Sequence, residues 1–156
     1  MKKLLVGFLM VISFNVYAID IAQCSSPSGK SYFPELGIVP KNKSGWGDDA
    51  ITGGIVKLTK TGKDEFEITF VDATKRMISS VEDGGIVMML NRGATSVSFL
   101  VIYPGKTAEI YTFLINKSGK SEYIQITSRG GSEVMIAKAT LMRGDCEYLN
   151  FSKLGE

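Results

Sequence analysis

The sequence contains no histidine, and it has only two cysteines among its 156 residues. Without histidine the chain cannot form a Ser-His or Cys-His catalytic pair, and it lacks the commonest transition-metal ligand. Two cysteines alone do not make an ordinary zinc site. We therefore expect no metal and no cofactor, and any catalyst here would have to use carboxylates, lysine, tyrosine or arginine.

Long hydrophobic runs are also scarce. The one clear run, Leu4–Phe14, follows Lys2 and Lys3 and precedes the small-residue ending at Ala18. This order is typical of a signal peptide that is cleaved after Ala18. The run is shorter than the roughly 20 residues of a bilayer span, so we expect no stable membrane anchor. The sequence thus predicts a signal peptide over 1–18 and one exported domain over 19–156, in the periplasm or secreted.

Clustered positive charge is missing from the predicted mature chain. Without Lys2 and Lys3, two of the 18 basic residues, the basic and acidic residues balance. Nucleic acids require basic patches or stripes, so a nucleic-acid partner is not expected.

The two cysteines, Cys24 and Cys146, lie near the two ends of the predicted mature chain. Export sends them to a compartment where thiols oxidise, so we interpret them as one disulfide. They lack the Cys-x-x-Cys spacing of a redox catalyst. A single disulfide of this span closes almost the whole domain.

Short apolar or alternating runs recur from residue 55 onward, separated by glycine, asparagine, aspartate and proline. This pattern predicts an all-β fold, a single antiparallel meander of about eight strands that forms a barrel or sandwich. Residues 19–54 are rich in Gly, Ser, Pro and Lys and are expected to be irregular, with the meander over 55–146 and a tail over 147–156. The predicted strands are 54–58, 65–71, 76–80, 86–91, 96–103, 109–115, 122–128 and 137–143.

Strands 100–103 and 110–115 are apolar on both faces, which indicates cover on two sides. The cover could be residues 24–54, held back by the disulfide, or a partner chain. A second copy of the chain is one such partner.

Two acidic pairs are candidate binding residues, Asp48-Asp49 and Glu82-Asp83. Glycosidases need two carboxyl groups across a cleft, which adjacent residues on one loop do not supply, so we expect no catalytic residues. Trp46, the only tryptophan, lies between glycines. It either anchors a ligand or plugs one end of the β domain.

Four short motifs follow one another along the chain. They are Cys-Ser-x-Pro-Ser-Gly-Lys from Cys24, Gly-Trp-x-Asp-Asp-x-Ile-x-Gly-Gly from Gly45, Tyr-Pro-Gly from Tyr103, and Leu141-Met142 before Cys146. With them the chain resembles a group of small exported proteobacterial proteins of unassigned function. The resemblance implies a periplasmic β domain and no active site. The format of a signal peptide and a small disulfide-bearing β-barrel is also similar, in architecture only, to periplasmic lysozyme inhibitors.

Three functions follow as expectations. The first is a non-enzymatic periplasmic binding protein, of inhibitor or immunity type, whose protein partner is a cell-envelope hydrolase. The second is a carrier of a small apolar ligand, as in lipocalin-like barrels. The third is an enzyme that uses carboxylates alone.

Overall fold

The computed structural model describes residues 18–71 and 74–155 and is all-β and antiparallel, as predicted. Its strands are β1 (Ile19–Phe33), β2 (Gly45–Ala50), β3 (Ile55–Gly62), β4 (Glu65–Val71), β5 (Met77–Ser79), β6 (Ile86–Arg92), β7 (Ser96–Tyr103), β8 (Thr107–Ile115), β9 (Ser121–Arg129) and β10 (Lys138–Leu149). Two short 3-10 helices, η1 (Lys41–Lys43) and η2 (Phe151–Gly155), complete it. Among these residues, no helix has the length and apolarity needed to cross a membrane.

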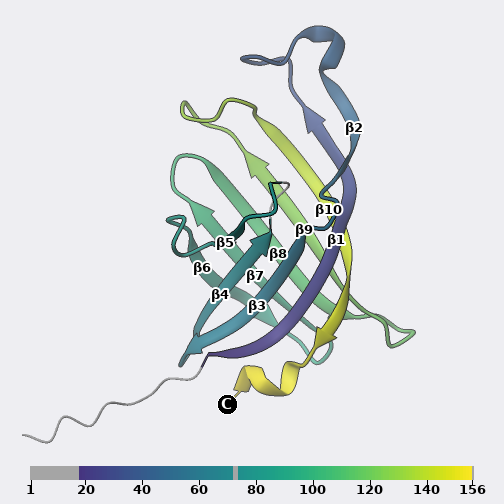
Figure 1. Cartoon of the computed structure of the whole chain (residues 1–156), viewed down its shortest axis with the longest axis vertical. Coiled ribbons are helices and arrows are strands. Elements are labelled where there is room, and N and C mark those ends of the chain that lie inside the picture. Colours follow the sequence, from purple (N-terminus) through teal and green to yellow (C-terminus); the bar gives the residue numbers. More distant parts are fainter. Residues whose placement is uncertain (1–17, 72–73, 156) are drawn as a thin grey trace, which may run out of the picture.

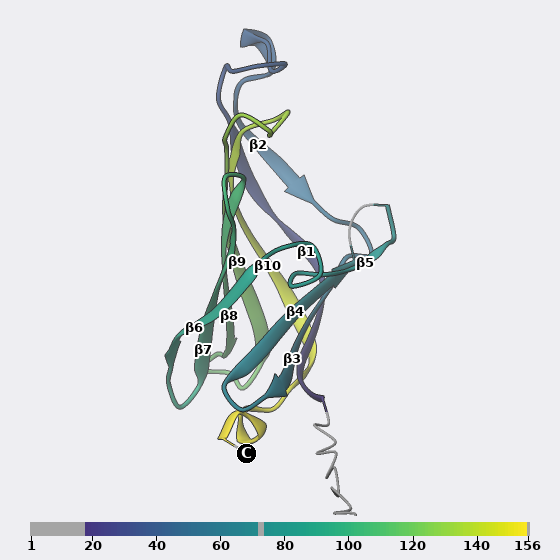
Figure 2. The same ribbon diagram turned by 90° about the vertical axis from the view of Figure 1, so that its left-hand side faces the viewer.

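The strands form one curled sheet in the order β5-β4-β3-β1-β10-β9-β8-β7-β6, with β2 paired to β1. The sheet bends round so that β3 and β4 face β7 and β8, as Figures 1 and 2 show. Its two edge strands, β5 and β6, are not paired with each other, so the architecture is a half-barrel. The predicted single meander is in fact two, β3–β5 and β6–β10, joined through β1.

The prediction that residues 19–54 are irregular is wrong, because β1 and β2 lie within them. β1 is the long central strand of the sheet, between β3 and β10. It changes partner on one side at Ser26, which has φ 51°, and at Pro27, which has no N–H to donate. Residues up to Ser25 pair with β3, and residues from Ser28 onward pair with β2. One proline, one glycine and four serines made this strand look like a loop.

The C-terminal tail is also more ordered than predicted. β10 continues past Arg143 to Leu149, and η2 follows it. η2 returns under one end of the half-barrel, where Leu154 is buried in the core. We call this the η2 end, and the opposite end, towards β2 and η1, the open end.

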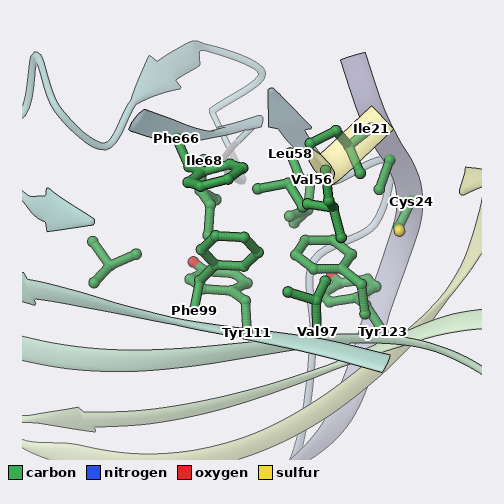
Figure 3. Packing of buried hydrophobic residues seen from close by; sticks show 14 residues of the cluster. Ile21, Cys24, Val56, Leu58, Phe66, Ile68, Val97, Phe99, Tyr111 and Tyr123 are labelled. Carbon is green, nitrogen blue, oxygen red and sulfur yellow. The ribbon is translucent and has the colours of Figure 1, made fainter. Parts of the chain in front are cut away.

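The hydrophobic core lies between the two facing walls of the half-barrel, towards the η2 end. Figure 3 shows Leu58, Phe66 and Ile68 on one wall pointing at Phe99 and Val97 on the other. The rings of Phe66 and Phe99 lie 4.9 Å apart. The core is therefore a filled aromatic and aliphatic layer at this end of the sheet.

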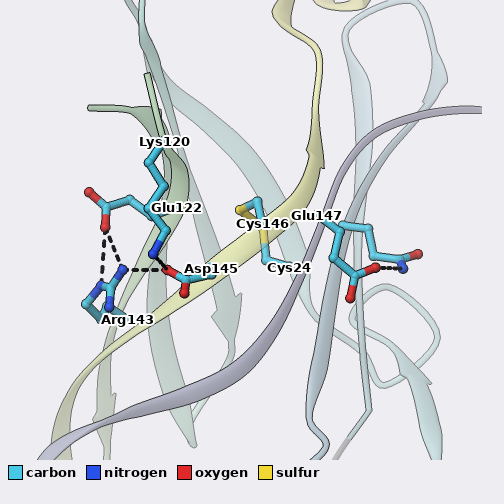
Figure 4. Close-up of a disulfide and its surroundings, with 8 residues drawn as sticks. Cys24, Lys120, Glu122, Arg143, Asp145, Cys146 and Glu147 are labelled. Atoms are coloured by element: carbon cyan, nitrogen blue, oxygen red, sulfur yellow. Dashed lines mark hydrogen bonds and ion pairs between the residues drawn. A yellow bond between two sulfur atoms is a disulfide. The ribbon is translucent and has the colours of Figure 1, made fainter. Parts of the chain in front are cut away.

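The predicted disulfide between Cys24 and Cys146 is confirmed. The two residues are directly paired across β1 and β10, the central strands, and Cys24 is fully buried (Figure 4). Nearby on the surface, Arg143 contacts both Glu122 and Asp145. The bond thus ties the first strand of the domain to the last.

The convex face of β6–β10 carries a row of apolar side chains that nothing covers in the described chain. Residues 24–54, one of the two covers expected for this face, instead run within the sheet. Ile126 and Leu141 are 48% and 53% exposed. The row runs through partners that are directly opposite in register: Met88, Leu100, Ile110, Ile126 and Leu141.

Candidate functional site

The concave face of β7–β10 changes from apolar to polar along the strands. Near the η2 end, Val97, Phe113 and Tyr123 lie side by side and are fully buried. Because side chains alternate between faces, Glu109 shares this face with Tyr111 and Phe113 on β8. Towards the open end the same face becomes polar, with Glu109, Thr127, Arg129, Lys138 and Thr140.

A cavity of about 440 Å³ lies where the face becomes polar. One wall is apolar and comes from the β1 turn, the approach to β3 and the end of β4: Pro27, Ile51, Ile55, Val56, Phe70 and Val71. The other wall comes from β7–β10 and is mostly polar: Tyr103, Thr107, Glu109, Tyr111, Gln125, Thr127, Arg129, Lys138, Thr140 and Met142. A concave site with an apolar surface and a few convergent polar groups is the usual form of a small-molecule site.

Glu109 is the most chemically distinctive group in this cavity. The hydroxyl of Tyr111 donates to its Oε2 at 2.7 Å, and Gln125 Nε2 donates to the Tyr111 oxygen at 3.1 Å. Burial raises the pKa of Glu109, and this effect outweighs the lowering by the Tyr111 hydrogen bond and by the charges of Arg129 and Lys138. The site therefore holds a carboxyl group that is only partly solvated and that has one fixed hydrogen-bond donor.

Tyr103 lines the same cavity as Glu109 and as Asp83, which follows β5. Burial raises the pKa of Tyr103 first of all, and the negative charges of Glu109 and Asp83 raise it further. Its hydroxyl is buried and forms no hydrogen bond with any described residue. Asp83, Tyr103 and Glu109 thus bring two carboxyl groups and a phenol to one side of the cavity.

A second polar network supports the rim of the cavity. Asp49 of β2 accepts hydrogen bonds from Ser31 at 2.6 Å and from Lys138 at 2.9 Å. Ser31 also bonds Thr140, 2.7 Å away, on the cavity wall. Burial alone raises the pKa of Asp49, but the Ser31 and Lys138 hydrogen bonds outweigh it and hold that pKa below its usual range.

The residues proposed from the sequence are dispersed. Asp83 lines the cavity, and Asp49 supports Lys138 at its rim. Asp48 forms a surface ion pair with Lys30. Glu82 is an exposed turn residue whose backbone N–H bonds Ser79.

Trp46 does not plug the domain. It is 72% exposed on β2, and its ring lies 5.5 Å from that of Tyr32, which is 41% exposed. The two rings form an aromatic patch on the outside of the open end. A plug would have required the indole to be buried.

Sequence reasoning missed Glu109, Tyr103 and Tyr111. A signal was present, because strict alternation along β8 places Glu109 on the same face as the apolar Tyr111 and Phe113. An acidic residue on an apolar strand face indicates either an edge or a polar cavity. Choosing between these needed the strand order.

The described residues contain no group of three or more side chains that could hold a metal ion. Comparisons with protein-family models, curated proteins and solved structures find no match.

Proposed function

We propose that this protein is an exported, non-enzymatic binding protein that holds a small amphipathic ligand in the cavity at its open end. The observation that carries the proposal is the cavity of about 440 Å³ with one apolar and one polar wall. The Cys24–Cys146 disulfide supports export, because such bonds persist in oxidising compartments. The signal peptide expected over residues 1–18 stays a prediction, since residues 1–17 lie outside the described part of the chain.

The position of the core favours an amphipathic ligand over a purely apolar one. The η2 end is occupied by the buried aromatic and aliphatic side chains of the core, so the interior there is filled by the protein's own residues. The available space borders Glu109, Gln125 and Thr127 on one side and Ile55 and Phe70 on the other. A ligand with a polar head and a short apolar body would satisfy both walls.

Binding fits the carboxyl groups of the cavity better than catalysis does. Glu109 and Asp83 come from different elements, which is one requirement of a carboxylate-only enzyme. However, within residues 18–71 and 74–155 the only side-chain hydrogen bond of Glu109 is with Tyr111, and Asp83 makes none. No paired acid and base emerge from these contacts.

A matched pair of variants on β8 tests the proposal. Thr107 lines the cavity, whereas its neighbour Ala108 is exposed on the opposite face. Thr107→Trp should fill the cavity and abolish binding of small amphiphiles, measured by calorimetry and by native mass spectrometry of the freshly purified protein. Ala108→Trp should bind like the wild type. Equal binding by both variants, or no binding to the wild type, would contradict the proposal.

A second candidate function is inhibition of a cell-envelope hydrolase, and the exposed Tyr32–Trp46 pair favours it. Aromatic residues dominate binding hot spots, and Trp46 has little other structural role. Trp46→Ala should abolish inhibition of a panel of peptidoglycan hydrolases, and Leu36→Ala, at another exposed apolar residue, should not. Wild-type protein that inhibits no member of the panel would exclude this candidate.

A further inference from the structure

Two of the cationic side chains that line the cavity form ion pairs within the described chain, whereas two of its carboxyl groups do not. Lys106 forms an ion pair with Glu133 at 3.4 Å, and Lys138 forms one with Asp49 at 2.9 Å. Asp83 and Glu109 have no ion-pair partner among residues 18–71 and 74–155. The remaining cation, Arg129, forms no ion pair there either, although its charge acts on Glu109. Two carboxyl groups without an ion pair in that part of the chain therefore face one guanidinium, and with Asp49 counted at the rim four acidic side chains meet three basic ones.

Tyr103 lies on the side of the cavity where this excess gathers. Glu109, Asp83 and Tyr103 all line this cavity, and both carboxyl groups act electrostatically on the phenol of Tyr103. The Tyr103 hydroxyl is buried without a hydrogen-bond partner in the described chain. An unbonded buried hydroxyl is costly, and a ligand that bonds it removes that cost.

Oε1 of Glu109 adds a third polar group to those of Asp83 and Tyr103. Tyr111 bonds Oε2 of Glu109, and no other hydrogen bond to this carboxylate is formed by a described residue. Oε1 thus stays free to accept a hydrogen bond. A group with several N–H donors and a positive charge would complement Glu109, Asp83 and Tyr103 together.

Resting on the proposed function, we propose that Glu109, Asp83 and Tyr103 bind the ammonium group of an amphipathic amine. The apolar part of the amine lies against the wall that contains Ile55 and Phe70. An organic cation fits better than a metal ion, because fewer than three metal-ligating side chains converge here within the described residues. The site thereby selects amines over alcohols and acids of equal chain length.

Three probes that differ only in their head group test this selectivity: octylamine, 1-octanol and octanoate. Calorimetry with the whole oxidised protein should give octylamine about tenfold tighter binding than 1-octanol, as expected for one charge-assisted hydrogen bond. Octanoate should bind most weakly. The affinity of octylamine should rise as the pH increases through the raised pKa of Glu109, while the affinity of 1-octanol should not change.

Glu109→Gln tests whether the charge of Glu109 binds the ammonium group, since glutamine keeps the shape of the side chain and removes its charge. Octylamine should lose about tenfold in affinity, and the affinity for 1-octanol should stay unchanged, which also shows that the variant is folded. Glu147→Gln is the matched control, because Glu147 is exposed outside this cavity, where it accepts a hydrogen bond from Gln23.

The pH dependence of octylamine binding is set by Glu109 and by the groups that act on its charge. These are Tyr111, Arg129, Lys138 and Asp83. Asp83 is a second carboxyl group that acts on Glu109, so Asp83→Asn should keep the part of the pH dependence of octylamine binding that comes from Glu109 itself. The double variant with Glu109→Gln should remove all of it.

The outcomes separate the two proposals. If 1-octanol or octanoate binds as tightly as octylamine, the cavity binds small molecules but the amine assignment is wrong. The same conclusion follows if Glu109→Gln leaves octylamine binding unchanged. If none of the three probes binds, the proposed function fails together with the assignment.

Discussion

The hydroxyl of Tyr111 bonds the carboxylate of Glu109 two residues away on the same strand, at 2.7 Å. Side chains two residues apart on a strand point to the same face, so the bond runs along β8 within the cavity. Tyr111 is almost fully buried and connects the filled core to the polar wall.

The first prediction concerns this bond. Tyr111→Phe removes the donor that favours the charged form of Glu109, so the pKa of Glu109 should rise further. The free energy of unfolding should fall by about 1–2 kcal/mol, because the Gln125 amide also loses a partner. Carbon-13 NMR titration of the Glu109 carboxyl and urea unfolding measure the two effects. Tyr32→Phe is the control, and an unchanged Glu109 pKa in Tyr111→Phe would contradict the assignment of the bond.

The second prediction concerns the pH dependence of stability at Glu109. Its folded-state pKa is raised from 4.5, so the folded protein holds this proton longer than the unfolded chain. The wild type therefore loses stability as the pH rises from about the unfolded pKa through the raised folded pKa. Glu109→Gln should gain stability relative to the wild type over this window, with a plateau above it. Urea unfolding at a series of pH values checks this, and a difference that is constant with pH would show that the pKa is not raised.

The third prediction concerns Asp49, where the sign is opposite. Its folded-state pKa is lowered from 3.8, so its stabilising contribution is present above that value and is lost as the pH falls through the folded pKa. At neutral pH, Asp49→Asn should cost about 1–2 kcal/mol, because bonds from Ser31 and Lys138 weaken. The cost should vanish in acid. Asp48→Asn, which affects only the exposed pair with Lys30, should cost less than about 0.5 kcal/mol.

The fourth prediction concerns the disulfide, which joins residues 122 positions apart. Replacing both Cys24 and Cys146 by alanine should lower the free energy of unfolding by about 3–5 kcal/mol, largely because the unfolded chain gains freedom. Urea unfolding of the oxidised wild type and the double variant gives the difference. A loss below about 1 kcal/mol would mean that the unfolded chain is already restricted by other contacts.

The fifth prediction separates the two faces of the sheet. Phe99 is fully buried on the concave face, so Phe99→Ala should cost about 3–5 kcal/mol. Ile126→Thr, on the convex face, should cost less than about 1 kcal/mol, because Ile126 is 48% exposed and threonine keeps the branched β-carbon. Thermal unfolding compares the two variants. Similar costs would indicate that the convex face is buried in solution, for example by a second copy of the chain.

The strands from residue 55 onward were predictable because their periodicity is local. β4 and β7 begin and end where the alternation of apolar and polar residues and the flanking turns indicated. β1 was not predictable in this way, because its regularity comes from pairing with β10, more than a hundred residues away. Pro27 and Ser26, which suggested a loop, instead mark the place where β1 exchanges β3 for β2.

The candidate site was predictable only in part, and for a related reason. The acidic pairs drew attention because adjacent charges are visible in the sequence, and one of their members, Asp83, does line the cavity. Glu109 and Tyr103 line one cavity because β7 and β8 pair in a particular register. Asp83 joins them from another part of the chain, after β5. A cavity depends on what lies opposite each strand, and no local pattern contains that information.

The central position of β1 governs the order in which the domain can be assembled. β1 is synthesised first, and its main partner β10 is synthesised last, so the middle of the sheet cannot form until almost the whole chain is available. The strands β3–β5 and β6–β9 have local connections and can pair earlier. Until β10 is available, the edge of β1 that pairs with β10 stays unpaired, and this exposed edge makes the incomplete chain more prone to aggregation than the finished one.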